Sequence, residues 1–195
     1  KQLVIDIDMI GEAKKENLKF RSSAKPGDFI FVSGDLGAST AGLKLFIEKF
    51  IKNKKINLKK FKNTLKKHLE PEAKFYKVKK FLKYINAMID VSDGMASDIT
   101  RICEQSKVGA VIFKDNIPVK DETRRAAKAV GKDAVEYALY GGEDFELIYT
   151  VSEKNLGKVK GFLVGEITRK KGVRLYSRGK EKLITKHGYD HFLIK

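Results

Sequence analysis

The sequence has no tryptophan, three prolines, three histidines and a single cysteine, Cys103. One cysteine excludes a disulfide within the chain, and the histidines have no spacing that builds a zinc site or a catalytic triad. Uninterrupted apolar runs such as residues 3–5 and 29–32 fall far short of the roughly 18 residues that a membrane span needs. No signal peptide is visible. We therefore expect a cytoplasmic protein with no membrane partner.

Positive charge, by contrast, is abundant. The 195 residues include 41 Lys and Arg against 25 Asp and Glu, a formal charge of +16, and 42% are hydrophobic, as in a globular protein. Such a charge fits a nucleic-acid or phosphate-ester partner, but it also fits a lysine-rich thermophile proteome with few Asn and Gln. Much of it lies in residues 49–83, where helical spacing favours a solvated face over a charge-driven binding surface. Charge alone does not choose a function.

The apolar patterning predicts a mixed α/β fold. Strands are expected at residues 3–10, 29–33, 87–91, 108–113, 145–151 and 162–168, with a hairpin at 172–183. Helices are expected at residues 37–51, 58–68, 72–86, 94–106, 121–130 and 133–139. This order lacks strict βαβ regularity, so we expect one α/β (α+β) domain over 1–195, a mixed β-sheet with packed helices. The lysine-rich helical segment 49–86 is expected to be an inserted or peripheral element.

The chain opens without methionine inside the first of these strands. A domain rarely begins in the middle of a sheet. We therefore expect the chain to be a piece of a longer protein.

The most informative stretch runs from Ala87 to Asp98, where an apolar strand ends in Asp-Val-Ser-Asp-Gly and a helix follows. Period-two alternation places Asp90 and Ser92 on one face, with Asp93 at the turn. Two carboxylates and a hydroxyl are hard oxygen ligands suited to Mg²⁺, and helix amides beside them would suit a phosphate. A simple helix cap would explain Ser92 or Asp93 but not Asp90.

Other motifs are weaker alone. Gly141-Gly142 precedes Glu143 and Asp144, and this turn presents one of the two acids to a cleft or leaves both in solvent. The glycine-rich run at 34–42 resembles a phosphate-binding turn but lacks the Lys-Ser/Thr of a P-loop, so backbone packing is favoured. Cys103 is expected to be a buried structural thiol.

As an ordered set, these motifs resemble the thiamine-monophosphate kinase family of the aminoimidazole ribonucleotide synthetase superfamily. The segments that carry the resemblance are Arg21 with residues 25–28, 32–37 with 41–43, 89–94 with Asp98, 141–147, 165–168 and 188–192. The resemblance implies the superfamily's C-terminal domain fold. It also implies phosphorylation of thiamine monophosphate by ATP to give thiamine diphosphate, with Mg²⁺ as cofactor.

The resemblance also implies roles for individual residues. Asp90 and Asp93 resemble Mg²⁺ ligands, Arg21 and Ser92 resemble ATP contacts, and Glu143 and Tyr189 resemble contacts to thiamine monophosphate. No catalytic nucleophile is implied, because phosphoryl transfer needs mainly positioning and charge neutralisation.

The family's upstream motifs, which include further metal ligands and the dimer-forming sheet, are not in this sequence. We therefore expect a homodimer formed through an upstream domain, and no activity from this chain alone. The alternatives are another ATP-using superfamily member, of the selenophosphate synthetase or hydrogenase-maturation type, or a basic nucleic-acid-binding module. Such a module would bind nucleic acid less tightly as the salt concentration rises. The resemblance to the kinase family argues against a nucleic-acid partner.

Overall fold

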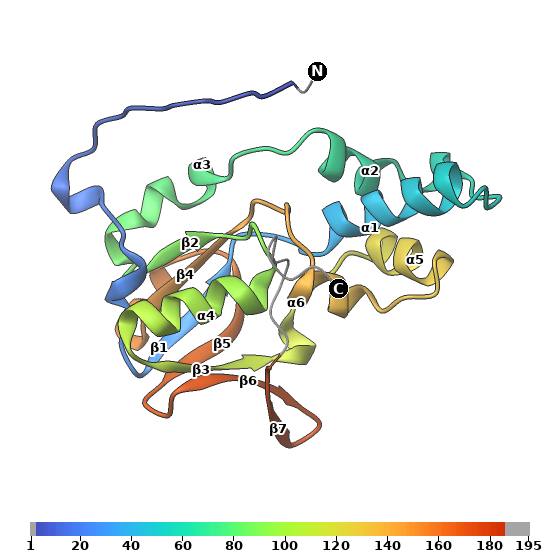
Figure 1. Ribbon diagram of the computed structural model, residues 1–195. Coiled ribbons are helices and arrows are strands. Elements are labelled where there is room, and N and C mark those ends of the chain that lie inside the picture. Colours follow the sequence, from blue (N-terminus) through green and yellow to red (C-terminus); the bar gives the residue numbers. More distant parts are fainter. Residues whose placement is uncertain (1–2, 186–195) are drawn as a thin grey trace.

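A computed structural model describes residues 3–185 and contains one seven-stranded mixed sheet (Figure 1). The strand order is β2-β4-β1-β5-β3-β6-β7. The strands are β1 (Asp28–Val32), β2 (Met88–Asp90), β3 (Gly109–Phe113), β4 (Leu147–Ser152), β5 (Phe162–Thr168), β6 (Gly172–Ser177) and β7 (Lys180–Leu183). Among these strands β3 and β6 pair in parallel and every other pair is antiparallel. The predicted mixed sheet is confirmed.

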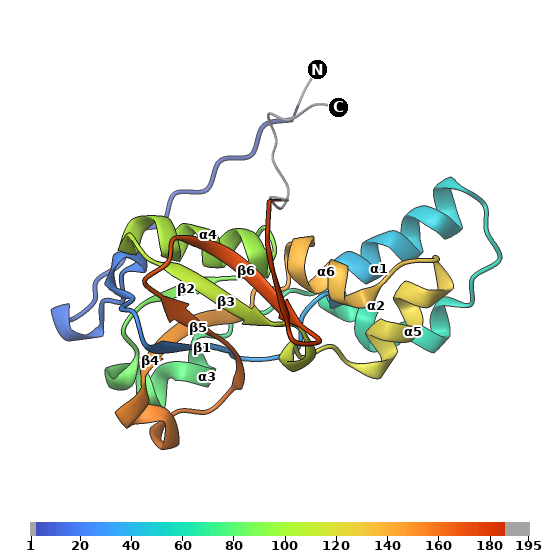
Figure 2. The same ribbon diagram turned by 90° about the horizontal axis from the view of Figure 1, so that it is seen from below.

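Helices cover both faces of the sheet and extend from one end of it (Figures 1 and 2). The α-helices are α1 (Ala38–Phe46), α2 (Lys62–Leu69), α3 (Phe75–Val78), α4 (Met95–Ser106), α5 (Asp121–Ala129) and α6 (Ala134–Tyr140). Short 3-10 turns occur at Lys15–Asn17, Arg21–Ser23, Leu58–Phe61, Lys79–Tyr84, Lys114–Asn116 and Glu153–Lys158, and a π-helical turn at Ile47–Ile51 continues α1.

The sheet alternates its side chains between two cores because successive strand residues point to opposite faces. Ile30 and Val32 join Ile99 and Ile102 of α4 in the larger core. On the other face, Phe31 and Tyr149 pack against the buried residues Val78, Phe81 and Leu82 around α3. A third cluster joins α1, α5 and α6, which with α2 form the helical end of the molecule (Figure 2). The sheet thus fixes the ends of β1, β2 and β4 relative to this helical end.

Two expectations from the sequence are corrected. Residues 3–10 form no strand: they are extended without sheet pairing, and their apolar side chains are exposed. Alternation shows that a segment is able to pair, but no strand of the described chain pairs with this one. The helix expected at 72–86 is mostly broken, because only Phe75–Val78 is α-helical and a kinked 3-10 stretch follows.

Among the described residues, no helix is both long and apolar enough to cross a bilayer.

Candidate functional site

The two acidic motifs meet at the adjoining ends of β2 and β4. The amide of Glu143 donates to the Ser92 carbonyl at 3.0 Å, and the amide of Phe145 donates to the Val91 carbonyl at 3.0 Å. A Cβ on Gly142 would lie 2.0 Å from the Ser92 carbonyl oxygen, so the contact requires a glycine there. Segments about 50 residues apart in sequence are therefore locked together through their backbones.

The turn after β2 is organised by Asp98. Asp98 is fully buried, and its Oδ2 accepts hydrogen bonds from the amides of Ser92 at 3.0 Å and Asp93 at 3.2 Å. Burial raises the pKa of Asp98 to about 6, although these amides and the nearby Arg101 oppose the shift. Neither Ser92 nor Asp93 caps α4 with its side chain, since the cap residue is Gly94 at φ +104°. The cap interpretation of these residues therefore does not hold.

Arg101 completes this turn from within α4. Its Nη1 donates to Asp98 Oδ1 at 2.7 Å, and its Nη2 pairs with Asp93 Oδ2. Asp90 ends β2 with an exposed side chain. The turn thus presents one solvent-facing carboxylate and one that is already paired.

The neighbouring acids Glu143 and Asp144 have opposite environments. The Asp144 side chain is buried and accepts hydrogen bonds from the amides of Gly37 at 2.5 Å and Ser39 at 3.0 Å, at the start of α1. Burial raises the pKa of Asp144 to about 6. The Glu143 side chain is 63% exposed and lies 3.8 Å from His68 Nδ1, which also contacts the Ser39 hydroxyl at 3.1 Å. Glu143 is therefore the acid of this turn that a ligand can reach.

Glu146 lies fully buried immediately before β4 and joins the sheet to the lysine-rich segment. Its carboxylate accepts from Lys67 Nζ at 2.8 Å, Lys77 Nζ at 2.7 Å and Ser33 Oγ at 2.6 Å. Burial raises the pKa of Glu146, but these hydrogen bonds outweigh it and the net pKa is lowered. Gly34 packs directly against the carboxylate, since a Cβ there would lie 2.6 Å from Glu146 Cδ. The glycine-rich run thus serves backbone packing here, as favoured from sequence.

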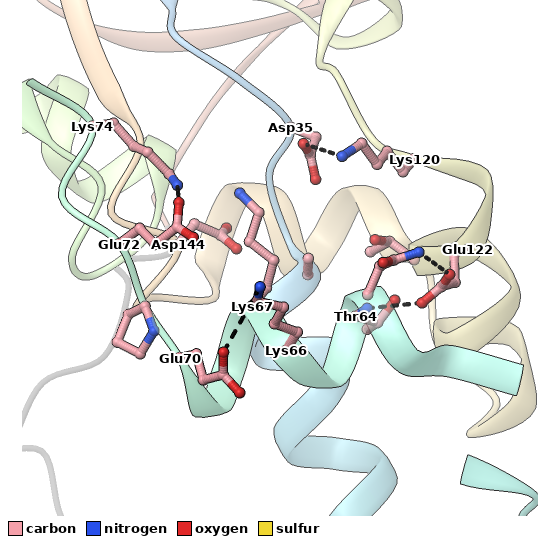
Figure 3. A pocket seen from close by; sticks show the side chains of 14 residues that line it. Asp35, Thr64, Lys66, Lys67, Glu70, Glu72, Lys74, Lys120, Glu122 and Asp144 are labelled. Carbon is pink, nitrogen blue, oxygen red and sulfur yellow. Dashed lines mark hydrogen bonds and ion pairs between the residues drawn. The ribbon is translucent and has the colours of Figure 1, made fainter. Parts of the chain in front are cut away.

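A pocket of about 420 Å³ lies beside this cluster, between α2 and the start of α5 (Figure 3). Twelve of its fourteen lining residues are polar or charged; the lining comprises Asp35, Ala38, Asn63, Thr64, Lys66, Lys67, Glu70, Pro71, Glu72, Lys74, Lys120, Glu122, Thr123 and Asp144. Most of its charges are already paired: Lys120 lies 3.0 Å from Asp35, and Lys74 lies 2.5 Å from Glu72. The pocket is therefore nearly neutral despite the charge of the chain.

The other predicted site residues are not gathered here. Arg21 lies in the turn at Arg21–Ser23, and its carbonyl accepts from Ser106 at the end of α4 opposite the acidic turn. Tyr189 lies outside the described residues. Cys103 is buried as predicted, and burial raises the pKa of its thiol to about 12.

The fit to Mg²⁺ is partial. Within residues 3–185 no three His, Cys, Asp or Glu side chains gather closely enough to hold a metal ion. Asp90 and Asp93 nevertheless supply the hard oxygens that Mg²⁺ prefers, and proteins often hold it through one or two carboxylates, substrate phosphates and waters. The described residues therefore supply two carboxylates of the kind that such a site would need, and no complete ligand set.

Sequence reasoning gave no role to Arg101, His68 or Glu146. The spacing of Asp98 and Arg101, three residues apart on one helix, is a signal that could have found that pair. The contacts of Glu146 with Lys67 and Lys77 join residues 79 and 69 positions apart and leave no such signal.

Fold and site together define an α/β domain in which backbone hydrogen bonds join two acidic turns at one edge of a mixed sheet. The chain belongs to the family described as AIR synthase related protein, C-terminal domain, which matches residues 25–177.

Within that family the chain is homologous to thiamine-monophosphate kinases. It is 35% identical to the enzyme of Buchnera aphidicola (subsp. Schizaphis graminum) over 98% of this chain and 61% of the relative. It is 36% identical to the enzyme of Aquifex aeolicus over 75% of this chain and 46% of the relative. The chain spans about 60% or less of the length of these relatives.

Solved structures agree with this placement. A structure described as AaThiL complexed with AMPPCP and TMP matches with a TM-score of 0.76 and 32% identity, over 88% of this chain and 53% of that one. The hydrogenase maturation protein HypE of E. coli matches at a TM-score of 0.59 and 19% identity, over 86% of this chain and 52% of that one. The second likeness shows the fold alone.

Proposed function

We propose that this chain is the C-terminal part of a thiamine-monophosphate kinase, which transfers the γ-phosphoryl group of ATP to thiamine monophosphate and yields thiamine diphosphate and ADP. The observation that carries the proposal is the backbone contact between Ser92 and Glu143. This hydrogen bond holds Ser92, which is expected to contact ATP, beside Glu143, which is expected to contact thiamine monophosphate. The homology to these kinases over most of the chain supports the same reaction.

The chemistry suits the residues present. Both reacting groups are anionic, so the protein contributes mainly by positioning them and neutralising their charge. Ser92 and Arg21 are proposed to contact ATP, and Glu143 and Tyr189 to contact thiamine monophosphate. The exposed carboxylate of Glu143 suits a ligand with a cationic ring, because opposite charges attract.

Asp90 and Asp93 are proposed to hold Mg²⁺ together with ligands from outside the described residues. When bound, the ion would neutralise developing charge on the phosphates. Asp98 would act through the turn, by fixing the amides of Ser92 and Asp93. The partial ligand set is the reason to propose that the chain alone is inactive.

The proposal includes a homodimer formed through an upstream domain and a cytoplasmic location. The hydrogenase-maturation alternative is less well supported, because that likeness is only 19% identical.

Phosphorus NMR on Mg-ATP mixed with thiamine monophosphate tests the reaction. The longest form of the protein should produce new diphosphate signals with ADP, and the 195-residue chain alone should not. Free thiamine, which lacks the acceptor phosphate, serves as the matched substrate control. A folded longest form without turnover would move the function to another ATP-using member of the superfamily.

A further inference from the structure

Arg101 connects two carboxylates with different environments. Asp98 is fully buried and uses both oxygens, one for the amides of the turn and one for Arg101 Nη1. The side chain of Asp93 is 28% exposed, and its Oδ2 is paired with Arg101 Nη2. One guanidinium therefore holds both a structural acid and an acid that faces solvent, a geometry that its planar fork permits.

The two halves of this bridge differ in how readily they open. The contact between Arg101 and Asp98 is the harder one to break, because breaking it would leave a buried carboxylate without its cation. The Asp93 contact lies nearer solvent, since the Arg101 side chain is itself 39% exposed. A ligand that competes for Asp93 would displace the outer contact and leave the inner one in place.

The charges define what such a competitor meets. Asp90, Asp93 and Asp98 carry three negative charges, and Arg101 reduces the total from −3 to −2. A bare divalent ion approaching Asp93 must replace the guanidinium on that carboxylate and is repelled by its positive charge. A divalent ion that arrives with phosphates brings anionic oxygens with it, so the guanidinium displaced from Asp93 can pair with a phosphate instead of opposing the ion.

We propose that Arg101 is a resident counter-ion which occupies Asp93 in the absence of metal and weakens the binding of bare divalent cations at this turn. The site is thereby biased toward a metal that arrives as its nucleotide complex. Arg101 is a positioning residue, because it acts through Asp93. The inference rests on the proposed function only in taking Asp93 as a metal ligand.

Mn²⁺ alone is the probe, since it substitutes for Mg²⁺ at oxygen sites and broadens nearby amide signals in NMR spectra. The 195-residue chain is titrated with Mn²⁺ in three forms: wild type, Arg101→Gln, and Arg125→Gln as a matched control. Arg125→Gln removes the same charge from an exposed position on α5. In Arg101→Gln the midpoint for broadening of residues 90–94 should fall at least threefold, while Arg125→Gln should match the wild type.

Asp93→Asn in the Arg101→Gln background should abolish the gain in Mn²⁺ affinity. A gain caused by a general change in stability would not depend on Asp93. Arg101→Lys covers the case in which Arg101→Gln does not fold: a lysine cannot bridge both acids, so its midpoint should also lie below that of the wild type. An unchanged or higher midpoint in both Arg101 variants, or no broadening near Asp93 in either, overturns the proposal. Because turnover is not measured, failure here leaves the phosphorus NMR test of the proposed function standing.

Discussion

The amide of Glu143 donates a hydrogen bond to the carbonyl of Ser92, at 3.0 Å. This contact joins the turn after β2 to the turn before β4. It explains why two short acidic motifs far apart in sequence form one candidate site. The close approach leaves no room for a side chain at Gly142.

Gly142→Ala should therefore disrupt both turns at once. Its Cβ would meet the Ser92 carbonyl at 2.0 Å, a contact that only backbone movement relieves. We expect a loss of about 1–3 kcal/mol in the free energy of unfolding, measured by urea denaturation. Gly157→Ala is the matched control, because no atom lies within 4 Å of a Cβ there. Equal effects of the two substitutions would contradict the close contact.

Glu146→Gln should strongly destabilise the protein. It removes the buried carboxylate that pairs with Lys67 and Lys77, and leaves two amines without their anion. We expect a loss of roughly 2–4 kcal/mol, because breaking a buried ion pair on one side is costly. Glu136→Gln, an exposed change on α6, should alter stability by less than about 0.5 kcal/mol. A small loss of stability in Glu146→Gln would show that the ion pairs with Lys67 and Lys77 contribute little to the fold.

The raised pKa of Asp144 predicts a pH dependence of opposite sign to that of most carboxylates. Its pKa is about 6 in the folded protein against 3.8 for the free side chain, so the folded state holds the proton more tightly. This favours the folded state below pH 4, and the contribution is lost as pH rises from about 4 to about 6.

Across that window the wild type should lose up to roughly 3 kcal/mol relative to Asp144→Asn, which cannot titrate at this position. Urea unfolding of both proteins at pH 4, 5 and 6 measures the difference. A difference that stays constant with pH would place the Asp144 pKa near its ordinary value.

Cys103 should be inert in the folded protein. It is buried on α4, and burial raises the pKa of its thiol to about 12, so almost no thiolate forms at pH 8. A thiol-reactive dye should label it only in denaturant. Labelling of the native chain at the rate of a free thiol would show that α4 opens readily.

Local pattern was enough to predict most of the sheet and helices. The apolar runs predicted as strands at 29–33 and 162–168 correspond to β1 and β5, because an apolar stretch of this length suits a buried strand. The same reasoning was wrong for residues 3–10, where an apolar pattern has no partner strand in the described chain. Periodicity reports which face a segment would bury, but not what covers it.

The candidate site was predictable only in part. Asp90, Ser92 and Asp93 stand in one motif, and the structure places their turn beside Glu143. The pairing of Arg101 with Asp93 is a tertiary detail, since these residues are eight apart and meet only because Asp98 holds the turn back toward α4. Long-range geometry of this kind has no counterpart in the sequence pattern.

The most direct test of the central claim compares Asp90→Asn with Asp115→Asn, a change of the same kind at an exposed residue outside the site. The measurement is the rate of thiamine diphosphate formation from Mg-ATP and thiamine monophosphate by the longest form of the protein. Asp90→Asn should lower this rate by a factor on the order of 100 or more, because the proposed metal ligand is lost. Asp115→Asn should leave it within about twofold. Full activity in folded Asp90→Asn would contradict the assignment of the β2 turn to the metal–nucleotide site.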